Sequence, residues 1–202
     1  MKKSRTPRLG LLLLCTLLAA AALTFAVGAA DNVVYISDYG NNANSGLSAD
    51  EPVQTMAQAF RKLGAAGGTV VICDTVTVTQ ATATFPERDN LITFTSLHDG
   101  VNYKSKAASL VLTSDVFLGG PTKFENIRIS SSNGVDIFCR GNDLTLGFGI
   151  ENIYSSNPIA VWGGTDCAVS GTTALSARYF DYTIEIDSGT WWYVRGGSIR
   201  TG

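Results

Sequence analysis

The chain has 202 residues, of which 45% are hydrophobic and 16% charged, and its formal net charge is −2. Four basic residues lie within the first eight positions. Without them, the chain has 11 Lys and Arg and 17 Asp and Glu, which gives a net charge of about −6. A general nucleic-acid binder needs clustered basic residues to displace counterions. The charge balance therefore argues against nucleic acid as a partner.

Residues 1–30 predict an export signal. Its basic start is followed by an apolar run from Leu11 to Ala26 and by small residues that end at Ala29 and Ala30. We expect cleavage near Ala30, a secreted or cell-surface location, and no membrane contact beyond this signal. The apolar run is nearly long enough to span a bilayer, so an uncleaved anchor is the alternative.

The segment 31–68 predicts an N-terminal strand, a loop and one short capping helix. Thr55 stands three residues before Gln58, as in a capping box, and Pro52 bars an earlier start. Gly64 is the stop signal.

Spacings of four and three place Met56, Phe60 and Leu63 on one apolar helix face. The opposite face is predicted to carry Gln58, Arg61 and Lys62. So short a helix needs tertiary packing to be stable, so we predict that it covers the first turn of a stack of strands. The alternative is a surface helix of an α+β domain.

The segment 69–202 consists of short alternating runs separated by Gly, Asn, Asp and Ser. There are ten, about one every 13 residues, a spacing that fits a sandwich, a barrel or a solenoid. The runs are TVVICD, TVTVTQ, LITFTS, SLVLTSD, NIRISSS, VDIFCRG, DLTLGFG, PIAVWGG, YTIEIDSG and TWWYVRGG.

Repeated residue types at matching positions favour the solenoid. Hairpin turn signals are sparse, whereas outward threonines and inward aliphatic residues recur from run to run. The outward set is Thr75, Thr77, Thr79, Thr93 and Thr95, and the inward set includes Ile127, Ile129, Val135, Ile137, Leu144 and Leu146.

Three cysteines follow the signal: Cys73, Cys139 and Cys167. An odd number argues against a disulfide framework in an exported chain, and their apolar neighbours indicate buried small hydrophobic residues. A bridge between Cys139 and Cys167 is the alternative, because these two would lie on neighbouring coils.

The sequence ends at Gly202 without a second capping segment. An uncovered last coil would expose apolar interior and unpaired backbone. We therefore expect the chain to be the front part of a longer protein, or another domain or subunit to cover this end.

Two segments carry a family resemblance. VYISDYGNNANSGLSADEPVQTMAQAF followed by GGTVVI resembles the opening of right-handed parallel β-helix proteins of the pectin-lyase-like superfamily, and KFENIRISSSNGVDIFCRGNDLTLGFGIEN is similar to their repeating coils. The resemblance implies an all-β, right-handed parallel β-helix (solenoid) with a short N-terminal capping helix. Because the superfamily holds lyases, hydrolases, adhesins and passive surface repeats, it implies a fold rather than an activity.

The catalytic residues of that superfamily are not evident, so catalytic residues are unknown. Hydrolase members use clustered aspartates and a GHG motif, whereas this chain has no DD pair and a single histidine, His98, in a turn where we expect a solvated residue. Lyase members bind calcium through several carboxylates, and the nearest match is Asp181, Glu185 and Asp187. Such a stripe is more often a solvated face, so no cofactor is expected and calcium is the alternative.

The run TWWYVRGG suggests carbohydrate binding. Strand alternation places Trp191, Tyr193 and Arg195 on one side and Trp192 on the other, and Trp162 is a second candidate. If Trp192 points inward, Trp191 and Tyr193 form an exposed pair whose flat faces, beside an Arg, suit a sugar ring. The alternative is that the rings belong to the core or cover the next coil.

These observations favour a non-catalytic exported module that contacts glycans or other surfaces. One alternative is a polysaccharide-active enzyme, a lyase before a glycoside hydrolase, with catalytic residues beyond Gly202 or at Asp181, Glu185, Asp187 and Arg195. The other is a structural spacer within a larger surface protein.

Overall fold

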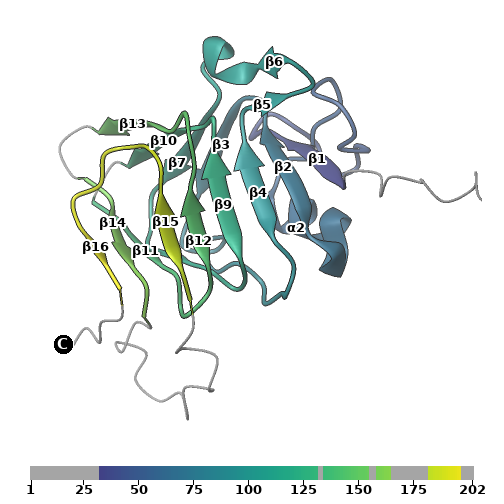
Figure 1. Cartoon of the computed structure of the whole chain (residues 1–202). Coiled ribbons are helices and arrows are strands. Elements are labelled where there is room, and N and C mark those ends of the chain that lie inside the picture. Colours follow the sequence, from purple (N-terminus) through teal and green to yellow (C-terminus); the bar gives the residue numbers. More distant parts are fainter. Residues whose placement is uncertain (1–31, 132–133, 155–157, 165–181, 197–202) are drawn as a thin grey trace, which may run out of the picture. The chain divides into compact units, whose positions relative to one another are not determined.

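The computed structural model describes residues 32–131, 134–154, 158–164 and 182–196. The predicted export signal, Cys167 and Asp181 lie outside these ranges. The described residues form three parallel sheets around a common apolar interior (Figure 1). None of the helices in these ranges is long and apolar enough to cross a membrane.

The three sheets are named A, B and C. Sheet A runs in the order β1 (Val33–Ile36), β2 (Gly68–Ile72), β4 (Ile92–Thr95), β9 (Thr122–Glu125), β12 (Leu144–Leu146) and β15 (Ile184–Ile186). Sheet B consists of β3 (Thr75–Val78), β7 (Ser109–Leu112), β10 (Arg128–Ser131) and β13 (Glu151–Tyr154). Sheet C consists of β8 (Val116–Phe117), β11 (Asp136–Phe138), β14 (Ala160–Trp162) and β16 (Val194–Arg195).

The chain visits the sheets in turn, and every strand pair within sheets A, B and C is parallel. The run β9, β10 and β11, for example, makes one coil, and the next coil repeats it with β12, β13 and β14. Parallel neighbours separated by a whole coil are the defining feature of a β-solenoid. The predicted fold class, a parallel β-helix with a short capping helix, is confirmed.

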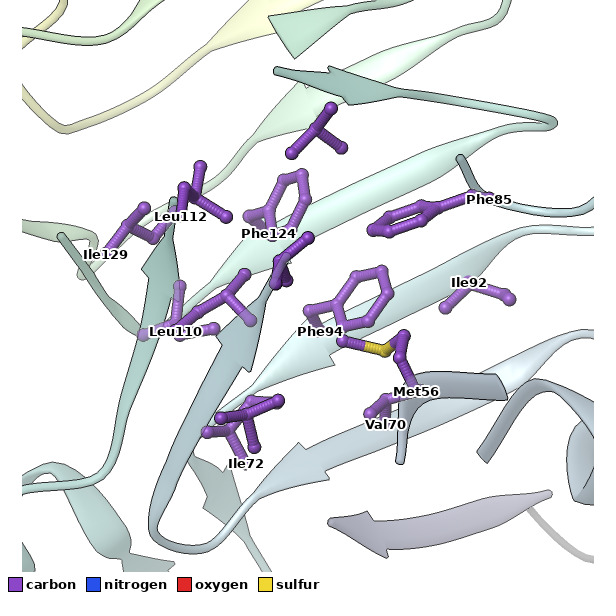
Figure 2. Packing of buried hydrophobic residues seen from close by; sticks show 14 of the residues in the cluster. Met56, Val70, Ile72, Phe85, Ile92, Phe94, Leu110, Leu112, Phe124 and Ile129 are labelled. Carbon is purple, nitrogen blue, oxygen red and sulfur yellow. The ribbon is translucent and has the colours of Figure 1, made fainter. Parts of the chain in front are cut away.

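The register between coils places residues of the same kind above one another in the interior. Phe94 lies opposite Val70 on one side and Phe124 on the other, and the Phe94 and Phe124 rings stack with centroids 5.1 Å apart (Figure 2). Burial of such large rings is the main favourable contribution to folding. The predicted inward residues Ile127, Ile129, Val135, Ile137, Leu144 and Leu146 are all buried.

The capping helix is α2 (Met56–Leu63), followed directly by the 3-10 turn η1 (Gly64–Ala66). Its apolar face is buried as predicted, and the Phe60 ring lies 5.0 Å from Phe85 and 6.2 Å from Phe94, measured between centroids. The Gly64 N–H donates to the Phe60 carbonyl and ends the helix. The helix thus closes the apolar interior beside β1 and β2.

The prediction for Gln58 was wrong. Its side chain is buried rather than on the solvent face, because the preceding loop covers the start of the helix and the Asn42 carbonyl accepts from Gln58 Nε2 at 3.0 Å. Only half of the capping box therefore forms. Thr55 Oγ1 accepts from the Gln58 N–H at 3.3 Å, whereas the Thr55 N–H donates to Asn42 Oδ1 at 3.0 Å.

An excursion between β4 and β7 covers part of the outer face of sheet A. It consists of the antiparallel pair β5 (Leu97–His98) and β6 (Val101–Asn102), followed by η2 (Tyr103–Lys106). Thr95, which was predicted to point outward, is only 4% exposed, and its hydroxyl donates to the Leu97 carbonyl at 3.3 Å. Thr95 follows the inward Phe94 in β4 and so lies on the outer face of the sheet, but the chain folds back over that position and shields it from solvent.

Candidate functional site

A second, smaller apolar cluster lies on the outer face of sheet C. Phe117, Phe138 and Trp162 occupy matching positions on β8, β11 and β14, directly after the inward residues of these strands. The Phe117 and Phe138 rings stack with centroids 5.2 Å apart and planes inclined by 8°, and Phe138 and Trp162 stack at 6.3 Å and 16°. Register alone therefore builds an outer aromatic stack, defined by these three residues.

The outer aromatic stack ends in a group that reaches solvent. The Tyr193 ring meets Trp162 edge-on at 5.1 Å, and the Trp192 ring lies 5.0 Å from Tyr193. The Arg195 guanidinium lies 5.1 Å from the centroids of both Trp162 and Tyr193. Trp192 is 65% exposed and Arg195 is also exposed, and we call Trp192, Tyr193 and Arg195 the terminal aromatic group.

An exposed pair of Trp191 and Tyr193 would require Trp192 to point inward, and the structure shows the reverse. Trp191 packs against the main core, and its Nε1 donates to the Ser188 carbonyl at 3.1 Å. Strand alternation does not apply here because β16 begins only at Val194. The exposed ring beside Tyr193 is therefore that of Trp192, which the sequence did not single out.

Trp162 lies beneath this group rather than forming a second exposed patch. It is 7% exposed, and its indole Nε1 is buried without a hydrogen-bond partner. Arg195 lies over its ring in a cation–π arrangement, an interaction for which Trp is the most favourable aromatic residue. Trp162 therefore supports Arg195 from below.

The carboxylates proposed for calcium are only partly within the described ranges. Glu185 and Asp187 are exposed on and after β15, and Asp181 lies outside these ranges. In register, Glu185 lies opposite Thr145, and Thr145 lies opposite Lys123. The described residues contain no cluster of three potential metal ligands from His, Cys, Asp and Glu. Calcium binding at these positions stays a prediction.

His98 is not an isolated loop residue. Its Nδ1 lies 2.7 Å from the Tyr35 hydroxyl, and the Tyr35 ring meets the Tyr103 ring edge-on at 6.2 Å. Burial raises the pKa of both tyrosines, so their hydroxyls stay protonated at neutral pH and do not act as bases. The sequence feature that could have indicated this contact is Tyr35 itself, a large aromatic residue between the inward Val34 and Ile36.

The two described cysteines are free thiols. Burial raises the pKa of Cys73 to about 11 and that of Cys139 to about 12. Both groups are therefore protonated at neutral pH, where a nucleophilic cysteine would need to be a thiolate. Cys139 is buried as predicted for a small apolar residue.

The fold defines the class of protein, a capped parallel β-solenoid. Comparisons with protein-family models, with curated proteins and with solved structures found no match. A function can therefore be argued only from the surface groups of the chain itself.

Proposed function

We propose that this chain is an exported, non-catalytic β-helix module of the pectin-lyase-like type that binds surface glycans through its terminal aromatic group. The observation that carries the proposal is the pairing of the 65% exposed Trp192 with Tyr193, whose rings lie 5.0 Å apart beside Arg195. Aromatic faces pack on the axial hydrogens of a sugar ring, while a neighbouring guanidinium donates hydrogen bonds to hydroxyl groups.

The support beneath this group favours recognition over a chance exposed side chain. Tyr193 rests edge-on against the buried Trp162, which in turn stacks on Phe138. Arg195 is held over two rings, so less of its conformational freedom is lost when a ligand binds. A supported aromatic pair with a fixed cation suits repeated weak contacts along a polysaccharide.

The test compares the migration of the wild type and of the Trp192→Ala variant in native gels that contain different polysaccharides. We expect an affinity loss of about tenfold for the polymer that retards the wild type most, because the most exposed ring of the group is removed. Phe148→Ala is the matched control, since Phe148 is 71% exposed and lies between β12 and β13, outside the terminal aromatic group. Equal migration of the wild type and Trp192→Ala in every gel would contradict the proposal.

A further inference from the structure

A cavity of about 700 Å³ lies between the capping helix and the segment that joins β3 to β4. One wall is the outer side of α2 and η1, with Ala57 and Ala65, and the other is the segment 81–90, with Ala81 and Pro86. The volume is within the range of small-molecule sites, roughly 300–1,000 Å³. β1 and β2, beside this helix, and β15 and β16 lie at opposite ends of the stacked coils (Figure 1), so this cavity is separate from the terminal aromatic group.

Arg88 in this cavity has unused hydrogen-bonding capacity. Its guanidinium lies over the Phe60 ring at 4.7 Å, and its Nε donates one long bond, 3.4 Å, to the Pro86 carbonyl. Nη1 is shielded from solvent and has no hydrogen-bond partner. No ion pair between described residues involves Arg88. A guanidinium has five N–H donors, and its preferred acceptor is a carboxylate.

The cavity is also held in shape by the protein. The Arg88 N–H donates to the Gly119 carbonyl at 2.9 Å, and a side chain at Gly120 would collide with the Arg88 side chain and carbonyl. Asn90 Nδ2 donates to the Ala65 carbonyl at 2.8 Å and thereby ties the two walls together. A preformed site loses little conformational entropy when a ligand binds.

The charges around the cavity limit the ligand. Arg61 on the helix adds a second cation, whereas the opposite wall carries two exposed acids, Glu87 and Asp89. A single negative charge can lie against Arg88, but a multiply charged anion also meets the repulsion of both acids. The walls offer apolar contact from alanine and proline beside the polar side chains of Thr82, Thr84 and Asn90, which suits a ligand with an apolar body and one polar end.

We propose that this cavity binds a small organic monocarboxylate with a flat apolar body, such as an aryl carboxylate. The carboxylate lies against the Arg88 guanidinium, and the flat body lies between the walls formed by Ala57 and Ala81. The inference does not rest on the proposed glycan contact, because none of its residues belongs to the terminal aromatic group.

The test is an amide NMR titration of the purified protein with benzoate, with benzamide as a neutral ligand of the same shape. We expect benzoate to give saturable shifts in residues 57–65 and 81–90, and benzamide to bind at least about tenfold more weakly. Equal affinity for benzamide would overturn the proposal, as would equal shifts caused by inorganic phosphate. Absence of shifts at a benzoate concentration of about 20 mM would also overturn it.

The Ala57→Leu variant fills the cavity from an exposed helix position with little loss of helix propensity. We expect it to lose benzoate binding at least about tenfold while its circular dichroism is unchanged. Ala43→Leu, in an exposed loop, is the control for an added apolar side chain. Arg88→Gln is expected to bind benzoate no better than Ala57→Leu does. If Arg88→Gln fails to fold, the result for Ala57→Leu alone tests the proposal. Wild-type benzoate affinity in Ala57→Leu would overturn the inference.

Discussion

At the scale of single residues, Phe94 joins the capping helix to the interior of the coils. It is fully buried, and its ring lies within 6.2 Å, between centroids, of Phe60, Phe85 and Phe124. We expect Phe94→Ala to lower the free energy of unfolding by about 3–5 kcal/mol, because it removes buried area and leaves a cavity that rigid strands cannot close. Urea unfolding followed by far-ultraviolet circular dichroism measures this loss.

Thr93 provides the matched control for Phe94. It is the adjacent residue of β4 and is half-buried on the opposite face of the sheet. Thr93→Ala is expected to lower the free energy of unfolding by no more than about 1 kcal/mol, the span of strand propensities. Equal losses in the two variants would mean that the ring stack does not hold the interior together.

Single residues were predictable from the sequence where one local rule applies. Thr55 caps the helix and Gly64 ends it, because both effects depend on neighbours within four residues. The exposure of Trp192 was not predictable. It depends on where β16 begins, and that is set by pairing with β14, a strand more than thirty positions earlier.

At the scale of elements, the start of the capping helix depends on Thr55. Its hydroxyl accepts from the Gln58 N–H and donates to Asn42 Oδ1 at 3.2 Å. We expect Thr55→Ala to lower the free energy of unfolding by about 1 kcal/mol, the usual effect of losing an N-cap. Thr55→Ser is expected to stay close to the wild type, because serine caps helices equally well. Thermal unfolding of the three proteins checks the order, and a Thr55→Ser loss as large as that of Thr55→Ala would contradict it.

Strand prediction succeeded wherever apolar residues alternate. Each of the ten runs recognised in the sequence contains a strand of the solenoid. Two longer strands were missed: β9, with the sequence TKFE, and β13, with ENIY. Both are rich in polar residues, and their strand conformation comes from parallel neighbours in adjacent coils rather than from their own pattern.

At the scale of the whole molecule, the stacking of coils could be predicted from the sequence, whereas the segments that fold back over the coils could not. Interior ladders follow from residues that repeat along the chain, so a solenoid could be inferred without knowledge of contacts. The 96–108 excursion, the burial of Thr95 and the cavity beside α2 depend on segments that return over a coil already formed. No repeat in the sequence encodes such returns, and the cavity beside α2 lies at one of them, whereas the outer aromatic stack follows from strand register.

One ion-pair group links three successive coils. Lys104 Nζ in the excursion lies 2.8 Å from Glu151 Oε1, and Arg128 Nη2 lies 3.2 Å from Glu151 Oε2. Arg128 Nη1 also donates to the Lys104 carbonyl at 3.2 Å. The hydrogen bond from Lys104, together with the charges of both bases, lowers the pKa of Glu151 below its ordinary value. The carboxylate therefore stabilises the fold above its unfolded-state pKa, about 4.3, and this contribution is lost as pH falls through the lower folded-state pKa.

Glu151→Gln tests this link between the coils. At pH 7 the variant is expected to be less stable than the wild type by no more than about 1 kcal/mol, because the Glu151 side chain is 49% exposed and its charge is screened by solvent. The difference is expected to narrow toward about pH 3, where the native carboxylate also takes up a proton. Urea midpoints at both pH values measure it, with Glu87→Gln as the control, since Glu87 is exposed and takes part in no ion pair between described residues. A difference that stays constant between the two pH values would show that the charge of Glu151 does not join the coils, and that the packing of its stem accounts for any effect.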